Sequence, residues 1–339
     1  MSNGFKLCLL PNDLKNIGTD LAEILRNYKI TTAMLSPSLL SVIDPHDLPE
    51  IRTLISIGEK CLPKVLEKWC GKVELWNGYG PTEATVLTTV HKFHDNDNEN
   101  IIGKPLNNVN CYVLDENSTP VAKGVEGDLY IGGKGVSLGY IDELQNENKF
   151  LKNPFSCDES LLYKSGDVAK ILEDGSLQYI NRKDNQVQIK GFRVELGEIE
   201  NILLDVKGID QAAVKYWEKN RQLVAYIVTG FDFTSKDEIN RFLQEKLPYY
   251  MIPNKMYILK QLPYNQSGKI DRKLLPEIET ENSNSTNGKP KNNTEKIISS
   301  VISYNLNCKV NMQDDFFELG GDSLMILKVI NELKGRGIY

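Results

Sequence analysis

The stretch Val73-Glu-Leu-Trp-Asn-Gly-Tyr-Gly-Pro-Thr-Glu83 joins a short apolar run to a loop with two glycines, an aromatic ring, a hydroxyl and a carboxylate. The apolar run predicts a strand at 73–76, and the glycines and the proline predict a loop at 77–83. Glycine lets a backbone approach a flat or anionic ligand closely, and the ring of Tyr79 can offer its face to a base. A β-turn with a capping Thr-Glu pair would have the same letters, so this stretch alone leaves both interpretations open.

The residues upstream of this loop alternate apolar runs with amphipathic segments. This pattern predicts strands at 5–10, 30–35 and 51–57 and helices at 20–28, 38–43 and 63–69. Such alternation builds a parallel sheet with helices on its faces, and these sheets bind ligands beyond the carboxyl ends of their strands. We therefore expect the loop at 77–83 to lie at a ligand-binding edge.

Four further parts follow along the chain. Short strands separated by turns predict an antiparallel β-subdomain, with strands at 110–114, 127–131 and 176–180. A compact α+β domain comes next, with strands at 186–194, 211–217, 223–229 and 256–259 and helices at 196–206 and 236–246. The segment 279–292 is rich in Asn, Ser and Thr and predicts a flexible linker. Two amphipathic helices end the chain, at 294–306 and from Ser323 to before Gly335.

Composition places the chain among ordinary globular proteins. It has 339 residues, 40% of them hydrophobic and 25% charged, and a formal net charge of −6. This charge argues against a nucleic-acid binder, which needs a basic face, and leaves small-molecule chemistry open. Six cysteines without a CxxC pair predict reduced intracellular thiols, and no apolar stretch approaches a membrane span. We therefore predict a cytoplasmic protein that binds neither nucleic acid nor membrane.

Two histidines have a spacing that metal sites also use. His91 and His94 lie three residues apart, but no nearby cysteine or carboxylate motif accompanies them. A solvated pair of loop residues is the interpretation we favour.

Seven segments read together resemble the adenylate-forming (AMP-binding) superfamily, and specifically the adenylation domain of a nonribosomal peptide synthetase followed by a peptidyl carrier domain. They are NGYGPTE at 77–83, GDLYIGGKGVSLGY at 127–140, YKSGD at 163–167, NRKDNQVQIKGFRVELGEIE at 181–200, LPYYMIP at 247–253, NQSGKIDR at 265–272 and DFFELGGDSL at 315–324. They occur in the order that the family has and cover nearly the whole chain.

The resemblance implies a fold of class α/β plus α+β. Residues 1–183 would be the C-terminal portion of an acetyl-CoA-synthetase-like adenylation core, with a doubly wound sheet and a β-subdomain. Residues 184–278 would be the small mobile C-terminal subdomain, 279–292 the linker, and 293–339 a partial helical carrier domain that binds phosphopantetheine.

The same resemblance assigns nucleotide-binding roles to the loop at 77–83. Tyr79 would stack on the adenine of ATP, Thr82 would contact phosphate, and Glu83 would hold Mg²⁺. A carboxylate near the triphosphate suits this task, because the metal screens the charge that grows as pyrophosphate leaves.

Three more nucleotide-binding residues follow from the resemblance. Asp167, which we expect in a Ser-Gly-Asp turn, would accept hydrogen bonds from both ribose hydroxyls. Arg182 would lie near the same site, and Tyr179 would cover the nucleotide. The family has a glycine before the arginine where this chain has Asn181. Asparagine tolerates left-handed backbone angles, so this departure is mild.

Two residues are implied for the moving part of the enzyme. Asp184 matches the hinge about which the small subdomain swings between two half-reactions, and we expect no bulky neighbour to oppose that motion. Lys269 matches the catalytic lysine, whose ammonium would reach the substrate carboxylate and the α-phosphate. Outside this motif, a lysine in a Ser-Gly-Lys turn would be an ordinary surface residue.

Ser323 matches the serine to which a phosphopantetheinyl transferase attaches phosphopantetheine covalently in carrier domains. The residue begins a predicted helix, so a helix N-cap is its simplest structural role. A phosphodiester on its hydroxyl would also lie at the positive end of the helix dipole.

The amino-acid pocket is implied by spacing from the loop and from the preceding strands. The candidates are nearly all apolar, and they are Met34, Ile55, Ile57, Gly78, Val86 and Leu87. An apolar substrate side chain is therefore favoured, although packing in the core of the sheet would select the same residue types.

The sequence departs from a complete adenylation domain in two places. The family's glycine-rich phosphate loop and the aspartate that binds the substrate's amino group have no match, and the carrier portion stops after its second main helix. We therefore expect a piece, truncated at both ends, of a larger synthetase with neighbours such as condensation or thioesterase domains. We expect this piece to adenylate poorly by itself.

Two other functions remain open from the sequence. A stand-alone acyl-CoA ligase of the same superfamily would need no fused carrier motif. A non-catalytic remnant that presents a carrier or docking surface would explain the missing phosphate loop. Retention of Lys269, Glu83 and Asp167 weighs against such decay.

Overall fold

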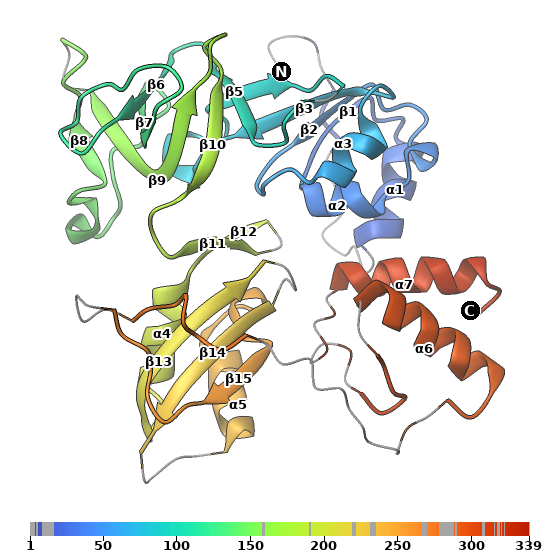
Figure 1. Cartoon of the computed structure of the whole chain (residues 1–339). Helices are drawn as coiled ribbons and strands as arrows, with labels where there is room; N and C mark the ends of the chain where they lie inside the picture. The colour runs from blue at the N-terminus through green and yellow to red at the C-terminus, as the bar shows by residue number, and fades with distance from the viewer. Residues whose placement is uncertain are drawn as a thin grey trace. The chain divides into compact units, whose positions relative to one another are not determined.

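The computed structural model describes residues 4, 6–8, 17–95, 97–157, 160–189, 191–218, 222–230, 235–265, 270–277, 288, 290–306, 309–314, 316, 319, 321 and 323–338. The chain divides into two compact units, Met1–Asp184 and Asn185–Tyr339. Each unit is described by itself below (Figure 1).

Unit 1 begins with parallel strands that are joined by helices. The elements are α1 (Ile17–Asn27), β1 (Thr32–Leu35), α2 (Pro37–Val42), β2 (Thr53–Ser56), α3 (Pro63–Trp69) and β3 (Glu74–Tyr79), with a short 3-10 turn at Pro45–Asp47. The strands run parallel, with Met34 opposite Ile55 and Ile55 opposite Trp76. Both α2 and α3 start at a proline, where the missing backbone N–H costs nothing.

One face of this parallel sheet is buried under the helices. Leu54 and Leu75 of the strands and Leu40 and Trp69 of the helices belong to one apolar cluster, and none is more than 1% exposed. The Trp69 ring N–H donates to the Leu40 carbonyl oxygen at 2.8 Å, which satisfies its only polar atom. Because side chains alternate along a strand, Ile55 lies on the opposite face.

The remaining strands of unit 1 are antiparallel. They are β4 (Thr89–Lys92), β5 (Ile101–Pro105), β6 (Val109–Leu114), β7 (Glu126–Gly133), β8 (Phe150–Lys152), β9 (Leu161–Ile171) and β10 (Leu177–Arg182), with 3-10 turns at Thr82–Ala84 and Glu143–Asn146. β4 pairs antiparallel with both β3 and β5 and so joins the two sets in one sheet, with the order β1-β2-β3-β4-β5-β10-β9-β7-β6. The predicted antiparallel subdomain is therefore continuous with the parallel strands (Figure 1).

Four local predictions differ from the structure. Lys6–Cys8 form no strand, and the rest of the strand predicted at 5–10 falls outside the described residues. β3 continues through Tyr79, because β4 pairs with Gly78 and Tyr79. The predicted Ser-Gly-Asp turn lies inside β9, where the pairing with β7 changes register. The strand predicted at 186–194 is a hairpin, β11 (Gln186–Ile189) and β12 (Phe192–Glu195).

Unit 2 continues from this hairpin as an α+β arrangement. Its elements are α4 (Leu196–Leu204), β13 (Ile209–Trp217), β14 (Gln222–Thr229), α5 (Lys236–Lys246), a 3-10 turn at Tyr249–Met251 and β15 (Lys255–Ile258). β14 is the central strand, antiparallel to β13 and parallel to β15. Ile199 of α4, Ile227 of β14 and Leu243 of α5 are fully buried in one apolar cluster. The helices therefore pack on one face of the three-stranded sheet.

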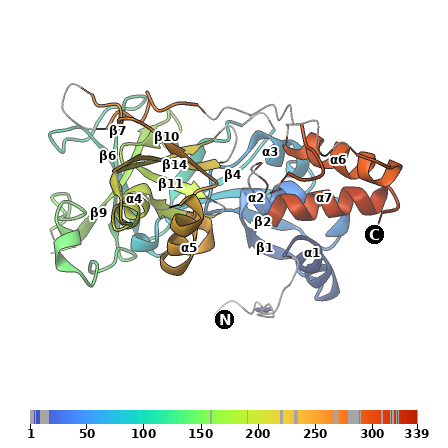
Figure 2. The same cartoon turned by 90° about the horizontal axis from the view of Figure 1, so that it is seen from below.

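The C-terminal part of unit 2 holds α6 (Asn293–Leu306) and α7 (Ser323–Gly335). The two helices lie side by side in both views (Figure 1 and Figure 2). The amide of Asn305 on α6 donates to the Glu332 carboxylate on α7 at 2.9 Å. Across the described residues, no helix combines the length and the apolarity that a membrane crossing requires, and the five described cysteines are free thiols.

The pairing of β4 with β5 generates a stability prediction at Gly103. Its φ is +82°, and a Cβ there would overlap the Val90 carbonyl and lie 2.7 Å from the His91 nitrogen. Gly175 has a φ of +83° and an open surrounding in which an added Cβ would meet no other atom, so Gly175→Ala is a matched control for backbone strain alone. We expect Gly175→Ala to lower the free energy of unfolding by about 1 kcal/mol and Gly103→Ala by at least ~2 kcal/mol more. Urea denaturation followed by tryptophan fluorescence measures both, and equal losses would contradict the steric argument.

Candidate functional site

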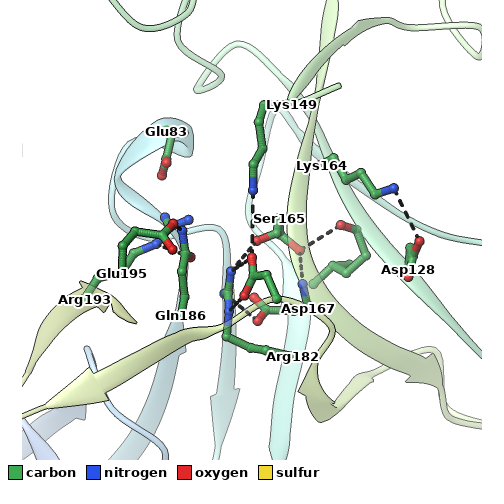
Figure 3. A network of polar contacts seen from close by, with 12 residues as sticks. Glu83, Asp128, Lys149, Lys164, Ser165, Asp167, Arg182, Gln186, Arg193 and Glu195 are labelled. Carbon is green, nitrogen blue, oxygen red and sulfur yellow. Dashed lines mark hydrogen bonds and ion pairs between the residues drawn. The ribbon is translucent and has the colours of Figure 1, made fainter. Parts of the chain in front are cut away.

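A buried carboxylate, Asp167, is the centre of the candidate site in unit 1. It lies in β9 directly opposite Arg182, the last residue of β10. The Arg182 Nη1 atom lies 2.7 Å from Asp167 Oδ1, and the Tyr79 hydroxyl at the end of β3 donates to Oδ2. Only 5% of Asp167 is exposed, so these partners compensate a charge that would be costly to bury alone (Figure 3). Tyr79, Asp167 and Arg182, which the sequence predicts to bind the nucleotide, are thus in direct contact with one another through the Asp167 carboxylate.

Ser165 supports the backbone that carries Asp167. Its hydroxyl donates to the Leu129 carbonyl oxygen at 2.8 Å and accepts from the Asp167 N–H at 3.1 Å. Its carbonyl oxygen accepts from Arg182 Nη2 at 3.0 Å (Figure 3). The serine therefore fixes both the carboxylate and the guanidinium that pairs with it.

Gly166, between these two residues, adopts a φ of +82°. A Cβ at this position would overlap the Asp184 carboxylate and lie 2.7 Å from Arg182 Nη2. Glycine is needed here both for the backbone angle and for the space that the guanidinium fills.

The predicted hinge residue, Asp184, is held by charged partners. Arg182 forms a bidentate pair with it, with Nε 2.7 Å from Oδ1 and Nη2 2.8 Å from Oδ2. Lys149 Nζ lies 3.8 Å from Oδ2. The adjoining Lys183 pairs with Asp128 at 2.7 Å. These ion pairs join Asp184 and Lys183 to other residues of unit 1, and the hinge role of Asp184 stays a prediction.

Protonation of the two groups that hold Asp167 follows from their surroundings. Burial, followed by the charge of Asp167, raises the pKa of Tyr79 well above its ordinary value, so the phenol stays a donor at neutral pH. Burial lowers the pKa of Arg182, but the hydrogen bond with Asp184 and the charges of both carboxylates outweigh it and raise the pKa overall. The guanidinium therefore remains charged throughout the physiological range.

Glu83 provides a second carboxylate in unit 1. It lies in the 3-10 turn Thr82–Ala84 and is 9% exposed, whereas Thr82 is exposed. The Tyr140 hydroxyl donates to Glu83 Oε1. Burial and the hydrogen bond to Glu83 raise the pKa of Tyr140, which keeps the phenol protonated.

This arrangement fits a magnesium ion that arrives with a nucleotide. No group of three or more His, Cys, Asp or Glu residues that could hold a metal occurs in the described part of the chain. Mg²⁺ is commonly held by one or two carboxylates together with substrate phosphates and waters, so a single oriented Glu83 is chemically sufficient. His91 instead pairs with Asp97 at 2.9 Å.

Five of the six predicted pocket residues gather at the face of the sheet opposite the helices. Met34 and Ile55 are neighbours in register. A Cβ on Gly78 would lie 2.7 Å from Leu87 Cδ1, 3.1 Å from Ile55 Cγ2 and 3.5 Å from Ile57 Cδ1, so these side chains converge on the glycine. None of the six candidates belongs to an apolar core cluster in the described part of the chain, which separates them from the packing residues Leu54 and Leu75.

Val86 is the candidate that stands apart from this group. It is 55% exposed and has a left-handed φ of +70°. The turn that contains it closes with a hydrogen bond from the Thr88 N–H to the Tyr79 carbonyl oxygen at 2.8 Å. A Cβ on Gly80 would lie 2.7 Å from that Thr88 nitrogen, so the glycine lets the loop fold back on β3.

Three other candidates are placed less fully. Tyr179 lies in β10 opposite Ala169 and is half-buried against the cluster that Tyr79 also contacts. Ser323 is the first residue of α7, but its side chain falls outside the described part. Lys269 falls outside the described residues altogether.

Several supporting residues had no predicted role. Ser165 and Tyr140 stand inside the motifs at 163–167 and 127–140, which is the signal that could have found them. Lys149 belongs to no motif that we recognised. Its relation to Asp184 is visible only once the chain has folded.

Comparison with protein families matches three parts of the chain. Residues 1–141 match the AMP-binding enzyme family, residues 198–269 match the AMP-binding enzyme C-terminal domain, and residues 296–338 match the phosphopantetheine attachment site. The three regions follow one another without overlap.

Among curated proteins, the chain is 38% identical over 328 residues to bacitracin synthase 3 of Bacillus licheniformis and 37% identical over 344 residues to tyrocidine synthase 2 of Brevibacillus parabrevis. These alignments cover 95% and 99% of the chain but only 5% and 10% of the relatives. The chain therefore spans a tenth or less of the length of these synthetases.

Solved structures share the fold. A holo nonribosomal peptide synthetase protein, PA1221, with adenylation and PCP domains and a bound vinylsulfonamide inhibitor, has a TM-score of 0.76 at 27% identity, over 96% of this chain and 56% of that one. The Vibrio cholerae adenylation domain AlmE in complex with glycyl-adenosine-5'-phosphate has a TM-score of 0.64 at 27% identity, over 74% and 50%. Together these matches identify the chain as a member of the adenylate-forming, AMP-binding superfamily, with the domain order of a nonribosomal peptide synthetase: adenylation core, adenylation C-terminal domain and phosphopantetheine attachment domain.

Proposed function

We propose that the chain is the part of a nonribosomal peptide synthetase that activates an amino acid with ATP and loads it on a carrier. The observation that carries this proposal is the Asp167 carboxylate, which a tyrosine hydroxyl and a guanidinium hold in place. Asp167 ends the YKSGD motif, whose aspartate the family resemblance assigns to ribose binding. A carboxylate oriented in this way can accept hydrogen bonds from the two hydroxyls of a ribose.

The first half-reaction joins the amino acid to AMP. An oxygen of the substrate carboxylate attacks the α-phosphorus of ATP, the bond to the β-phosphate oxygen breaks, and pyrophosphate leaves with the electron pair. No general base is required, because the attacking carboxylate is already ionised at neutral pH. Lys269 would place its ammonium near the attacking carboxylate and the α-phosphate, where negative charge grows.

The nucleotide is bound by the residues of unit 1. Tyr79 would stack on the adenine, Tyr179 would cover it and Thr82 would contact phosphate. Glu83 would hold Mg²⁺, which screens the charge of the triphosphate and of the departing pyrophosphate.

The second half-reaction transfers the aminoacyl group from AMP to a thiol. A phosphopantetheine group on Ser323 would supply that thiol, after a phosphopantetheinyl transferase has attached it. The match to the phosphopantetheine attachment family supports this step and disfavours a ligase that uses free CoA. The neighbours in the intact synthetase would be domains such as condensation or thioesterase domains, and the cytoplasm is the compartment where ATP and CoA are available.

The substrate side chain would be apolar. Ile55, Ile57 and Leu87 converge on Gly78 on a sheet face that is separate from the apolar core. None of the six candidate lining residues is charged, so a charged substrate side chain would lose its hydration without gaining a partner.

Nucleotide binding through Asp167 is tested by its amide variant. Asp167→Asn should weaken AMP binding at least tenfold by isothermal titration calorimetry, because hydrogen bonds to a charged acceptor contribute about 1.5–3 kcal/mol. Asp128→Asn is the matched control, since Asp128 is also buried, at 9% exposed, and pairs with Lys164 and Lys183 away from Arg182. An equal loss in both variants, or no loss in Asp167→Asn, would refute the assignment.

Carrier function is tested by incubating the chain with CoA and a phosphopantetheinyl transferase. Mass spectrometry should find one phosphopantetheinyl group on the wild type and none on Ser323→Ala. Ser300→Ala, which changes an exposed serine of α6 in the same part of the chain, should be modified like the wild type. Modification of Ser323→Ala would exclude Ser323 as the attachment residue.

Substrate class is tested with non-hydrolysable aminoacyl-AMP analogues. The leucyl analogue should bind at least tenfold more tightly than the glutamyl analogue, because the unpaired charge costs more than about 1.4 kcal/mol to bury. Leu87→Lys should narrow or reverse this preference in the same competition assay. A wild type that prefers the glutamyl analogue would show that the converging apolar residues do not line the pocket.

A further inference from the structure

The turn that carries Glu83 is joined to the segment after β7 by three hydrogen bonds. The Ser137 N–H donates to the Glu83 carbonyl oxygen at 2.8 Å, and the Thr85 hydroxyl donates to the Gly135 carbonyl oxygen at 2.6 Å. The third bond runs from the Tyr140 hydroxyl to the Glu83 carboxylate. The first bond holds the backbone of the turn, the second holds the side chain of the threonine that ends it, and the third acts on the Glu83 carboxylate.

The backbone at Tyr140 is itself clamped by one side chain. Asn146 accepts from the Tyr140 N–H through Oδ1 at 2.6 Å and donates through Nδ2 to the Tyr140 carbonyl oxygen at 3.2 Å. The preceding Gly139 has a φ of +131°, and a Cβ there would lie 2.8 Å from Asn146 Oδ1. The glycine therefore makes room for the clamp.

The ring of Tyr140 is also held in place. It meets Phe150 edge to face, with ring centroids 5.3 Å apart and planes at 77°. Phe150 in turn contacts Tyr163 at 5.1 Å, and Tyr163 is completely buried. With the ring and the backbone both fixed, the phenol hydroxyl has little freedom, and its position is set by the fold.

We propose that Tyr140 is a positioning residue that orients the Glu83 carboxylate for Mg²⁺. This inference rests on the proposed function, in which Glu83 holds the ion. It adds a residue that acts through Glu83 and does not itself touch metal or nucleotide.

A glutamate side chain without a fixed orientation samples several rotamers, and ordering it on metal binding costs conformational entropy. A fixed donor on Oε1 removes that cost in advance. It leaves the charge on the carboxylate, because a neutral phenol donates a hydrogen bond without forming an ion pair. Hydrogen-bond partners of metal ligands typically change metal affinity by about 10–100-fold when they are removed.

The test uses Tyr140→Phe, which keeps the ring against Phe150 and removes the hydroxyl. Two binding measurements are made on the whole chain with fluorescent nucleotide analogues: ATP binding during a Mg²⁺ titration, and AMP binding in EDTA. We expect the Mg²⁺ concentration for half-maximal ATP binding to rise about tenfold. AMP binding without metal, which depends on Asp167 and Tyr79, should change less than about twofold, and this second readout also reports on folding.

Two further variants make the result specific. Tyr112→Phe removes the hydroxyl of another half-buried tyrosine of unit 1, whose ring stacks on Phe155 at 4.5 Å, and should leave both readouts at the wild-type level. Asn146→Ala loosens the clamp on Tyr140 and should shift the Mg²⁺ dependence in the same direction as Tyr140→Phe, by a smaller factor.

The outcomes separate this inference from the proposed function. If the wild type binds ATP with Mg²⁺ and Tyr140→Phe has the same Mg²⁺ dependence, Tyr140 does not position Glu83, while the proposed function stands. If Tyr140→Phe weakens AMP binding in EDTA as much as ATP binding, its role is general to the fold and the inference is wrong. If the wild type binds neither nucleotide, both the proposed function and this inference are overturned.

Discussion

The pairing of Arg182 with two carboxylates is the interaction on which the candidate site depends. One guanidinium contacts Asp167 through Nη1 and Asp184 through Nε and Nη2, all at 2.7–2.8 Å. Only the planar fork of arginine can serve two carboxylates in this way. Because Asp167 is almost completely buried, loss of this partner would leave an uncompensated charge inside the sheet. The Asp167 carboxylate and Asp184 at the end of unit 1 are thus fixed by the same cation.

The carboxylates of Asp167 and Glu83 have a second feature in common: each accepts a hydrogen bond from a tyrosine hydroxyl. Tyr79 serves Asp167 in this way and Tyr140 serves Glu83. In both tyrosines burial raises the pKa, so the donor stays protonated. A neutral donor orients a carboxylate without cancelling its charge. Asp167 combines this donor with an ion pair, as its deeper burial demands.

The site forms where the sheet changes from parallel to antiparallel pairing. β3 has parallel β2 on one side and antiparallel β4 on the other, and the loop between β3 and β4 folds back over Gly80. This reversal presents Tyr79 to Asp167 of a strand 88 residues away. Among the described residues, it also leaves Ile55 and Gly78 on the face opposite the one that the helices cover.

Most of the helices and strands, and several residues of the candidate site, could be predicted from the sequence. Helices and strands follow local periodicity, and the family's motifs are contiguous. The helices at Pro63–Trp69 and Lys236–Lys246 have the predicted bounds, and the motifs alone point to Tyr79, Asp167 and Arg182, which the fold brings together.

The features that the sequence misplaced depend on distant partners. β3 extends to Tyr79 because β4 pairs with it, and Gly166 lies inside β9, where the pairing with β7 shifts register. The roles of Tyr140 and Lys149 belong to the same class, since each meets its carboxylate 57 or 35 residues away only after the sheet has closed. Local sequence determined which chemical groups are present and on which elements they lie. Tertiary folding alone decided which of these groups form ion pairs or hydrogen bonds with one another.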